Sequence, residues 1–133
     1  MKEMRFYTVE GNENVAYETV EQARKNVNGI WENTPWGYTE KLNYEIIETV
    51  INENGKITKK VVEKGITEAG KKFQQEKIQE YENAIEELKV EIEKIKNRKY
   101  KTEENRQKKI KEVEKNIAMH EEWKREATMV ING

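Results

Sequence analysis

A continuous heptad pattern in the second half of the chain constrains the fold more than any other feature of the sequence. Six large apolar residues follow one another at alternating spacings of three and four: Ile78, Tyr81, Ile85, Leu88, Ile92 and Ile95. This spacing places all six on one stripe of an α-helix, with glutamate and lysine on the other faces. The pattern predicts a long helix that packs its apolar stripe against a second helix.

The second helix is predicted after a break at residues 97–101. Thr102 is followed by two glutamates, which is typical of a helix N-terminus. Ile110, Val113 and Ile117 continue the apolar stripe at heptad spacing, and His120, Lys124 and Ala127 then fall on the same seam, which becomes more polar. Two helices of about 30 and 27 residues with a short connection favour an antiparallel hairpin at coiled-coil angles. Because the first helix carries more apolar residues on its stripe than the second, a homodimer through the coiled coil is a further option.

The first half of the chain contains strand and turn signals. Residues 4–9 are rich in aromatic and β-branched side chains, and residues 11–14 predict a turn into a short partner strand at 15–17. Residues 42–51 and 56–63 predict a β-hairpin, because the Asn-Gly pair between them tolerates the backbone of a tight turn.

A helix is predicted between these strands. Thr19 and Gln22 form a capping-box pattern, and Gly29 is expected to end the helix as its C-cap. We therefore expect an α+β fold: a small βαββ or ββαββ unit at residues 1–66, followed by an antiparallel helical hairpin at residues 67–133 that begins with Thr67 as N-cap.

Missing residue types exclude much of enzyme chemistry. The chain has no Cys, Ser or Asp, and its single histidine is His120. Serine and cysteine nucleophiles, thiolate metal sites and Asp-based calcium or magnesium loops are therefore ruled out. The isolated glycines form no phosphate-binding loop. We expect a protein that is not an enzyme and that carries no metal and no cofactor.

Charge and hydropathy predict a cytoplasmic protein without a membrane segment. The formal net charge is -1. No stretch reaches the roughly 18 consecutive apolar residues of a membrane span, and the first residues lack the apolar core of a signal peptide. The lack of cysteine is consistent with a reducing compartment.

Charge is strongly polarised along the predicted hairpin. Residues 94–111 have a net charge of +7, and residues 76–93 have a net charge of -5. An antiparallel hairpin places the basic segment at its tip, where it could bind nucleic-acid phosphates or an acidic protein surface. A solvated tip without a ligand is the alternative. The candidate binding residues are Lys94, Lys96, Arg98, Lys99, Tyr100, Lys101, Arg106, Lys108, Lys109 and Lys111.

A second candidate site is an aromatic segment around Pro35. Trp31, Trp36 and Tyr38 lie within eight residues, and the proline and glycine between them predict a loop. Such side chains can anchor a protein partner or stack on bases. The favoured interpretation, however, is that one or both tryptophans cover the small core, because the chain has only two leucines.

Two other features are interpreted as structural. His120 lies on the predicted helix seam and is expected to be a packed, hydrogen-bonded residue, since no second histidine lies one turn away. A row of glutamates on the first helix predicts a solvated face; mimicry of nucleic-acid phosphates is the alternative. The row consists of Glu76, Glu80, Glu87 and Glu91.

These observations favour a protein-interaction module. Short length and a composition rich in Lys, Glu, Asn and Ile resemble those of small accessory proteins of phages and mobile elements, although no motif carries the likeness. We therefore expect a protein partner and an inhibitor or adaptor that acts in the host cytosol on a macromolecular machine, such as a nucleic-acid-guided defence enzyme. Direct nucleic-acid binding through the basic tip is one alternative, and a structural coiled-coil assembly protein is another.

Overall fold

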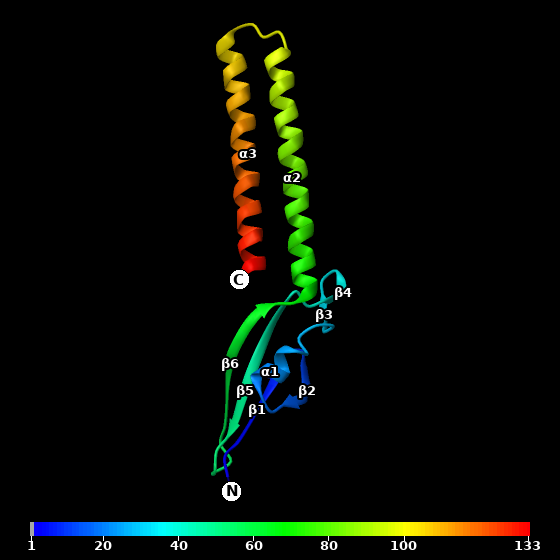
Figure 1. Ribbon diagram of the computed structural model, residues 1–133, viewed down its shortest axis with the longest axis vertical. Coiled ribbons are helices and arrows are strands. Elements are labelled where there is room, and N and C mark those ends of the chain that lie inside the picture. The colour runs from blue at the N-terminus through cyan, green and yellow to red at the C-terminus, as the bar shows by residue number, and fades with distance from the viewer. Residues whose placement is uncertain (1) are drawn as a thin grey trace. The chain divides into compact units, whose positions relative to one another are not determined.

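The computed structural model describes residues 2–133 and shows an α+β fold in which an antiparallel sheet is followed by two long helices (Figure 1). The chain divides into two compact units, Met1–Phe73 and Gln74–Gly133. The division lies inside the first long helix, whereas the sequence places it at the start of that helix. The elements are β1 (Met4–Val9), β2 (Asn12–Tyr17), α1 (Val20–Arg24), β3 (Trp31–Thr34), β4 (Gly37–Glu40), β5 (Asn43–Ile51), β6 (Ile57–Ile66), α2 (Glu68–Asn97) and α3 (Glu103–Asn132).

The main sheet has the strand order β2-β1-β5-β6, with antiparallel pairing throughout. The predicted β5–β6 hairpin is confirmed. Its turn contains Gly55 at φ +80, and the Asn52 carboxamide oxygen accepts hydrogen bonds from the backbone N–H groups of Asn54 and Lys56, each at 2.9 Å. The predicted partner strand of β1 is also confirmed, with the turn at Gly11 at φ +92.

Helix α1 begins where the sequence predicts and ends earlier. The Thr19 hydroxyl accepts a hydrogen bond from the Gln22 backbone N–H at 3.1 Å, and the Gln22 side chain accepts one from the Glu18 N–H at 3.0 Å. The expectation that Gly29 caps this helix is wrong, because the helix ends at Arg24 and Lys25 is its C-cap. Gly29, at φ +76, instead turns the chain toward β3.

The core of the first unit lies between α1 and one face of the sheet. Its buried members are Val9, Ala23, Val27, Ile30 and Ile46. Arg24 of α1 also forms two hydrogen bonds with the Glu63 carboxylate on β6, at 2.8 and 2.5 Å. These bonds lower the pKa of Glu63, and a hydrogen bond from the Tyr44 hydroxyl at 2.8 Å acts in the same direction. The short helix is therefore held by both apolar packing and a charged contact.

Helix α2 begins with a buried N-cap. The Thr67 hydroxyl accepts a hydrogen bond from the Gly70 N–H at 3.0 Å and donates one to the Lys41 carbonyl at 2.6 Å. The Thr67 N–H donates to the Leu42 carbonyl at 3.0 Å. The predicted cap is confirmed, and it joins the first turn of α2 to the segment that precedes β5.

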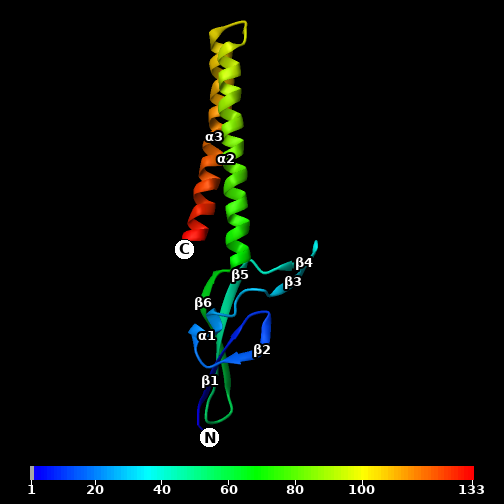
Figure 2. The same cartoon turned by 45° about the vertical axis from the view of Figure 1, so that its right-hand side comes forward.

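Helices α2 and α3 form the predicted antiparallel hairpin, and they run side by side in both views (Figures 1 and 2). Each helix has 30 residues. The Thr102 hydroxyl caps α3 by accepting a hydrogen bond from the Asn105 N–H at 3.1 Å. Near the connection, the buried side chains of Ile95, Ile110 and Val113 form the hairpin core.

The half of the hairpin farther from the connection is held by aromatic and charged contacts. The Tyr81, His120 and Trp123 rings lie against one another, with His120 and Trp123 centroids 5.0 Å apart. His120 Nδ1 lies 2.7 Å from the Asn116 carbonyl oxygen, which confirms the packed, hydrogen-bonded histidine. Lys124 and Glu82 form an ion pair between the helices at 3.2 Å.

Candidate interaction surfaces

The predicted basic residues gather around the connection between α2 and α3. Lys94 and Lys96 lie in the last turn of α2, the next basic residues lie in the connection, and the rest lie in the first turns of α3. Eight of the ten candidate residues are exposed: Lys94, Lys96, Arg98, Lys99, Lys101, Lys108, Lys109 and Lys111. We call these eight residues the basic tip.

Tyr100 and Arg106 have a different position from the rest. Both are half-buried, and Tyr100 packs against the core of Ile95, Ile110 and Val113. The Arg106 guanidinium lies 5.8 Å from the Tyr100 ring centroid and donates a hydrogen bond to the Arg98 carbonyl at 2.8 Å. These contacts give both side chains a role in shaping the connection.

Ion pairing separates the basic tip into two groups. Three members have acidic partners: Lys96 with Glu93 at 3.4 Å, Arg98 with Glu91 at 3.6 Å and Lys109 with Glu112 at 3.4 Å. Five lysines form no ion pair with any residue between 2 and 133: Lys94, Lys99, Lys101, Lys108 and Lys111. Their charge is available to an anionic ligand.

The aromatic segment forms a β-hairpin, and the predicted loop is wrong. Strands β3 and β4 pair in antiparallel register, with Asn33 opposite Tyr38 and Trp31 opposite Glu40. Trp31 and Tyr38 therefore lie on the same face of this two-stranded sheet, because cross-strand partners share a face. Trp36 lies in the turn. We call residues 31–40 the aromatic hairpin.

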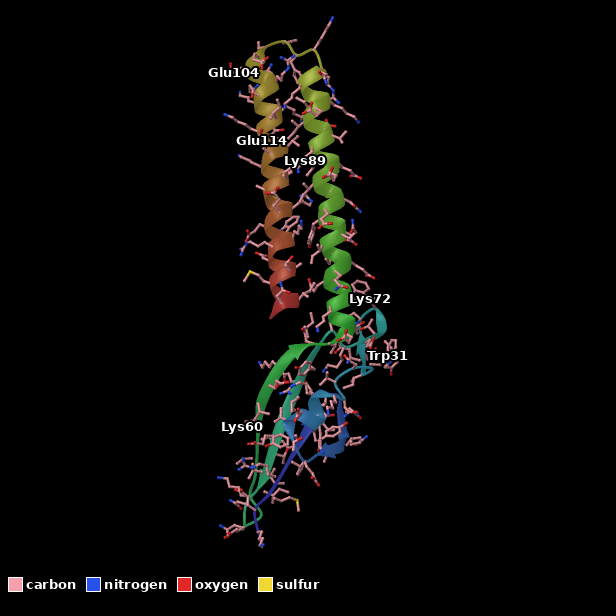
Figure 3. All side chains as sticks on the ribbon, in the orientation of Figure 1. Trp31, Lys60, Lys72, Lys89, Glu104 and Glu114 are labelled. Carbon is pink, nitrogen blue, oxygen red and sulfur yellow. The ribbon has the colours of Figure 1, made fainter. Side chains whose placement is uncertain are left out.

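The aromatic hairpin exposes all three of its large side chains. Trp31 is 63% exposed, Tyr38 is 74% exposed and Trp36 is 92% exposed, and the Trp31 side chain extends from the strand (Figure 3). The expectation that a tryptophan covers the small core is therefore wrong. The core is filled by α1 and by Ile30, which is buried at the point where the chain enters β3.

Several bonds hold the aromatic hairpin in its conformation. At its base, the Lys41 N–H donates to the Ile30 carbonyl at 2.7 Å, and the Gly29 N–H donates to the Glu40 carboxylate at 2.9 Å. At its turn, the Thr34 hydroxyl donates to the Gly37 carbonyl at 2.7 Å. The aromatic side chains are thus displayed on a backbone that is already ordered.

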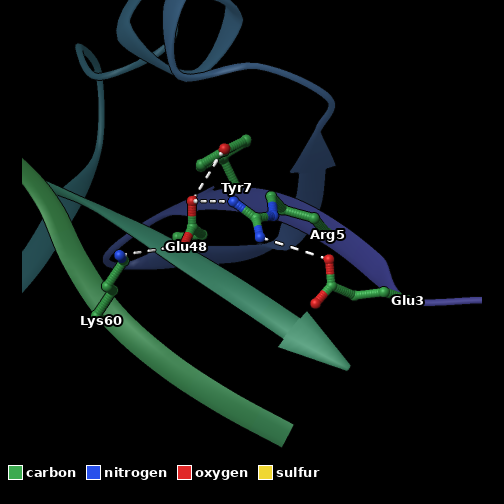
Figure 4. Close-up of polar contacts among 5 residues, drawn as sticks. All are labelled: Glu3, Arg5, Tyr7, Glu48 and Lys60. Atoms are coloured by element: carbon green, nitrogen blue, oxygen red, sulfur yellow. Dashed lines mark hydrogen bonds and ion pairs between the residues drawn. The ribbon is translucent and has the colours of Figure 1, made fainter. Parts of the chain in front are cut away.

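A buried carboxylate network on the sheet was not predicted from the sequence. Glu48 accepts a hydrogen bond from the Tyr7 hydroxyl at 3.0 Å and forms ion pairs with Arg5 at 3.5 Å and Lys60 at 3.6 Å (Figure 4). The network borders a cleft of about 310 Å³. Because a buried charge is stable only when it is paired, these contacts explain how a glutamate fits within β5. This network could be predicted only from the pairing register of β1, β5 and β6, because Arg5, Tyr7 and Lys60 lie 12 or more residues from Glu48 in the sequence.

A groove of about 920 Å³ lies between α2 and α3 in the half of the hairpin far from the connection. Its lining combines three acidic and three basic side chains with Ile85 and Met129 at the apolar positions. The charged lining residues are Glu82, Glu86, Glu121, Lys89, Lys124 and Arg125. This balance favours neither an anionic nor a cationic ligand.

No group of three or more metal-ligating side chains gathers among residues 2–133. Within the same residues, no helix combines the length and the apolar character needed to cross a bilayer. Comparison with protein-family models, curated proteins and solved structures found no match to this chain.

Proposed function

We propose that the chain is a non-enzymatic protein-interaction module that binds its partner through the aromatic hairpin. The observation that carries this proposal is the exposure of Trp31, Trp36 and Tyr38 on one ordered hairpin. Tryptophan and tyrosine are, together with arginine, the residue types that contribute most to binding energy at protein interfaces. An ordered backbone adds to this, because less conformational entropy is lost on binding.

The same proposal includes the kind of partner that the chain binds. A short module that lacks Cys, Ser and Asp and displays preformed contact side chains is suited to act as an inhibitor or adaptor. We propose that it acts in the host cytosol on a macromolecular machine, such as a nucleic-acid-guided defence enzyme. The basic tip would add an electrostatic contact with an acidic surface or with nucleic acid held by that partner.

Replacing the three aromatic side chains should abolish partner binding without unfolding the protein. We expect Trp31→Ala/Trp36→Ala/Tyr38→Ala to lower affinity by about a hundredfold or more, because truncation of a central aromatic contact costs about 2 kcal/mol or more. The measurement is quantitative affinity capture from lysate of the native host, followed by a binding isotherm with the captured protein.

A matched control truncates three exposed apolar residues of β6 in the same unit. Ile57→Ala/Val61→Ala/Val62→Ala should bind as the wild type does. Both triple variants should stay folded, with thermal midpoints within roughly 6–10 °C of the wild type, since each exposed side chain contributes no more than about 0.5 kcal/mol. Equal capture by the aromatic variant and the wild type, or capture of no protein at all, would contradict the proposal.

Direct nucleic-acid binding is a second candidate, and the five unpaired lysines of the basic tip support it. We expect Lys99→Glu/Lys101→Glu/Lys108→Glu/Lys111→Glu to remove any binding of labelled single- or double-stranded DNA and RNA. Wild-type affinity should fall by about 0.7–0.9 log units per contacted phosphate for each tenfold rise in salt. Fluorescence anisotropy at low and near-physiological salt measures both effects.

The control for this experiment reverses the same number of charges away from the basic tip. Lys25→Glu/Lys56→Glu/Lys89→Glu/Lys115→Glu changes net charge equally, and these four lysines are exposed. A comparable loss in both variants would show that net charge alone is responsible. Wild-type binding that is independent of salt, or that is absent at low salt, would remove this candidate.

A further inference from the structure

Helix α3 carries a second apolar stripe, outside the seam that it forms with α2. Met119, Trp123 and Val130 are 46, 40 and 45% exposed. Their spacings of four and seven residues place them on one face of the helix. The Trp123 ring is held at its inner edge by Tyr81 and His120, with centroid distances of 5.9 and 5.0 Å. The stripe therefore presents an aromatic side chain in a defined position.

The adjoining flank of α2 is acidic. Successive residues of an α-helix turn by about 100°, so the rows that follow from the seam contain Ile85, then Tyr81, then Lys77 with Ala84, and then Glu80 with Glu87. Because the Trp123 ring contacts Tyr81, the apolar stripe of α3 lies on the flank of the hairpin to which these rows lead. In the row between Tyr81 and the glutamates, Ala84 provides only a methyl group, and Lys77 forms an ion pair with Glu80.

Carboxylates border the stripe on both sides. Glu126 lies between Trp123 and Val130 on α3 and, like Glu87, has no ion-pair partner among residues 2–133. Glu80 pairs with Lys77 at 3.4 Å in an exposed contact, which contributes little to stability and leaves the carboxylate free to exchange partners. The remaining nearby cation is Lys115, one turn before Met119. Negative charge therefore dominates around the apolar side chains.

We propose that this surface binds a basic amphipathic α-helix of a partner protein. We call it the Trp123 face, and it comprises Met119, Trp123, Val130, Glu80, Glu87 and Glu126. The apolar side of the bound helix covers the stripe, and its lysine or arginine side chains reach the flanking carboxylates. The face lies on the hairpin unit and is distinct from the aromatic hairpin, so this inference goes beyond the function proposed above.

Charge also argues against a second copy of the chain as the occupant. A two-fold axis perpendicular to the helices would set α2 against α2 and bring two rows of glutamates together. Like charges at such positions repel and disfavour the association. A cationic helix instead neutralises these glutamates.

The test uses a synthetic helical peptide of about 18 residues, roughly five turns, with leucine on one face and lysine on the others. Two comparison peptides have the same length: one replaces lysine with glutamate, and one scrambles the order so that no apolar face forms. Isothermal titration calorimetry with the full chain should show binding of the basic amphipathic peptide, with both comparison peptides at least about tenfold weaker. Absence of binding at about 100 µM peptide would overturn the proposal.

Paired variants locate the binding surface. We expect Met119→Lys/Val130→Lys and Glu80→Lys/Glu87→Lys each to weaken peptide binding by about tenfold or more. The matched controls lie on the opposite flank of the hairpin: Val90→Lys/Met129→Lys for the apolar pair and Glu86→Lys/Glu114→Lys for the acidic pair. These controls should stay within about twofold of the wild type.

Two results would overturn this assignment. The first is an equal loss of binding in the control variants, which would show general electrostatic attraction. The second is a wild-type dimer, detected by light scattering, that becomes a monomer in Met119→Lys/Val130→Lys. That result would assign the face to a second copy of the chain. Helical circular dichroism of each variant, expected to match that of the wild type, verifies that the hairpin is intact.

Discussion

Replacing Gly70 with alanine should destabilise the chain by about 3 kcal/mol, although the same change in an exposed helix interior stabilises by about 1 kcal/mol. An ideal Cβ at this position would lie 2.0 Å from the Leu42 carbonyl oxygen and 2.6 Å from Cγ1 of Ile66. The Leu42 oxygen cannot retreat freely, because it accepts the hydrogen bond from the Thr67 N–H at 3.0 Å. Urea unfolding, followed by tryptophan fluorescence, measures the decrease in the free energy of unfolding.

Lys72→Ala is the matched control for this prediction. Lys72 lies two residues further along α2 and is exposed, so its truncation should change stability by no more than about 0.5 kcal/mol. A Gly70→Ala variant that is as stable as the wild type would mean that the first turn of α2 does not approach Leu42 as closely as described. The comparison separates steric conflict from helix propensity.

Truncation of Ile95 to alanine should destabilise the helical hairpin by about 3–4 kcal/mol. Its side chain is 0% exposed and lies at the centre of the core that includes Ile110 and Val113. Removing a buried isoleucine side chain loses its transfer free energy and leaves a cavity. Few other side chains in this unit are fully buried, so the thermal midpoint of the helical circular dichroism signal should fall by roughly 15 °C or more.

Val90→Ala tests whether burial of the side chain is the cause of the stability loss expected for Ile95→Ala. Val90 lies on the same helix and is 52% exposed, so its truncation should cost no more than about 0.5 kcal/mol. Similar melting of the two variants would place the hairpin core elsewhere. A much lower thermal midpoint for Ile95→Ala than for Val90→Ala would support the described packing of α2 against α3, which positions both the Trp123 face and the basic tip.

The helical hairpin is the part of the fold that could be predicted most fully. The periods of the apolar residues in α2 and α3 are local properties of the chain, and so are the caps at Thr67 and Thr102. Helix periodicity relates residues only three or four positions apart, and therefore no knowledge of distant contacts is needed. The β5–β6 hairpin was predictable for the same reason, through its Asn-Gly turn.

The aromatic hairpin shows where local signals fail. Pro35 and Gly37 are typical of a loop, yet they lie in and beside the tight turn of two short strands. Two nonlocal interactions stabilise those strands. The Ile30 side chain is buried in the core, and the Gly29 N–H donates a hydrogen bond to the Glu40 carboxylate. The exposure of the tryptophans likewise depends on α1, which fills the core that they were expected to cover.

The candidate sites show the same division. The concentration of positive charge in residues 94–111 is countable in the sequence, whereas the separation of Tyr100 and Arg106 from the exposed lysines follows from their packing near Ile95. The Trp123 face could not be predicted, because it combines side chains of two helices. The network around Glu48 could not be predicted either, because it depends on the pairing register of β1, β5 and β6.

The α+β class, the helical hairpin, its caps and its charge polarity can all be predicted from the sequence, because they depend on residue type and on short-range spacing. Long-range packing determines that Trp31, Trp36 and Tyr38 are exposed, that Tyr100 and Arg106 are half-buried beside the basic tip, and that glutamates flank the apolar stripe of α3. Exposure is a property of what packs against a side chain. Those neighbours come from distant parts of the chain, so local sequence patterns do not predict them.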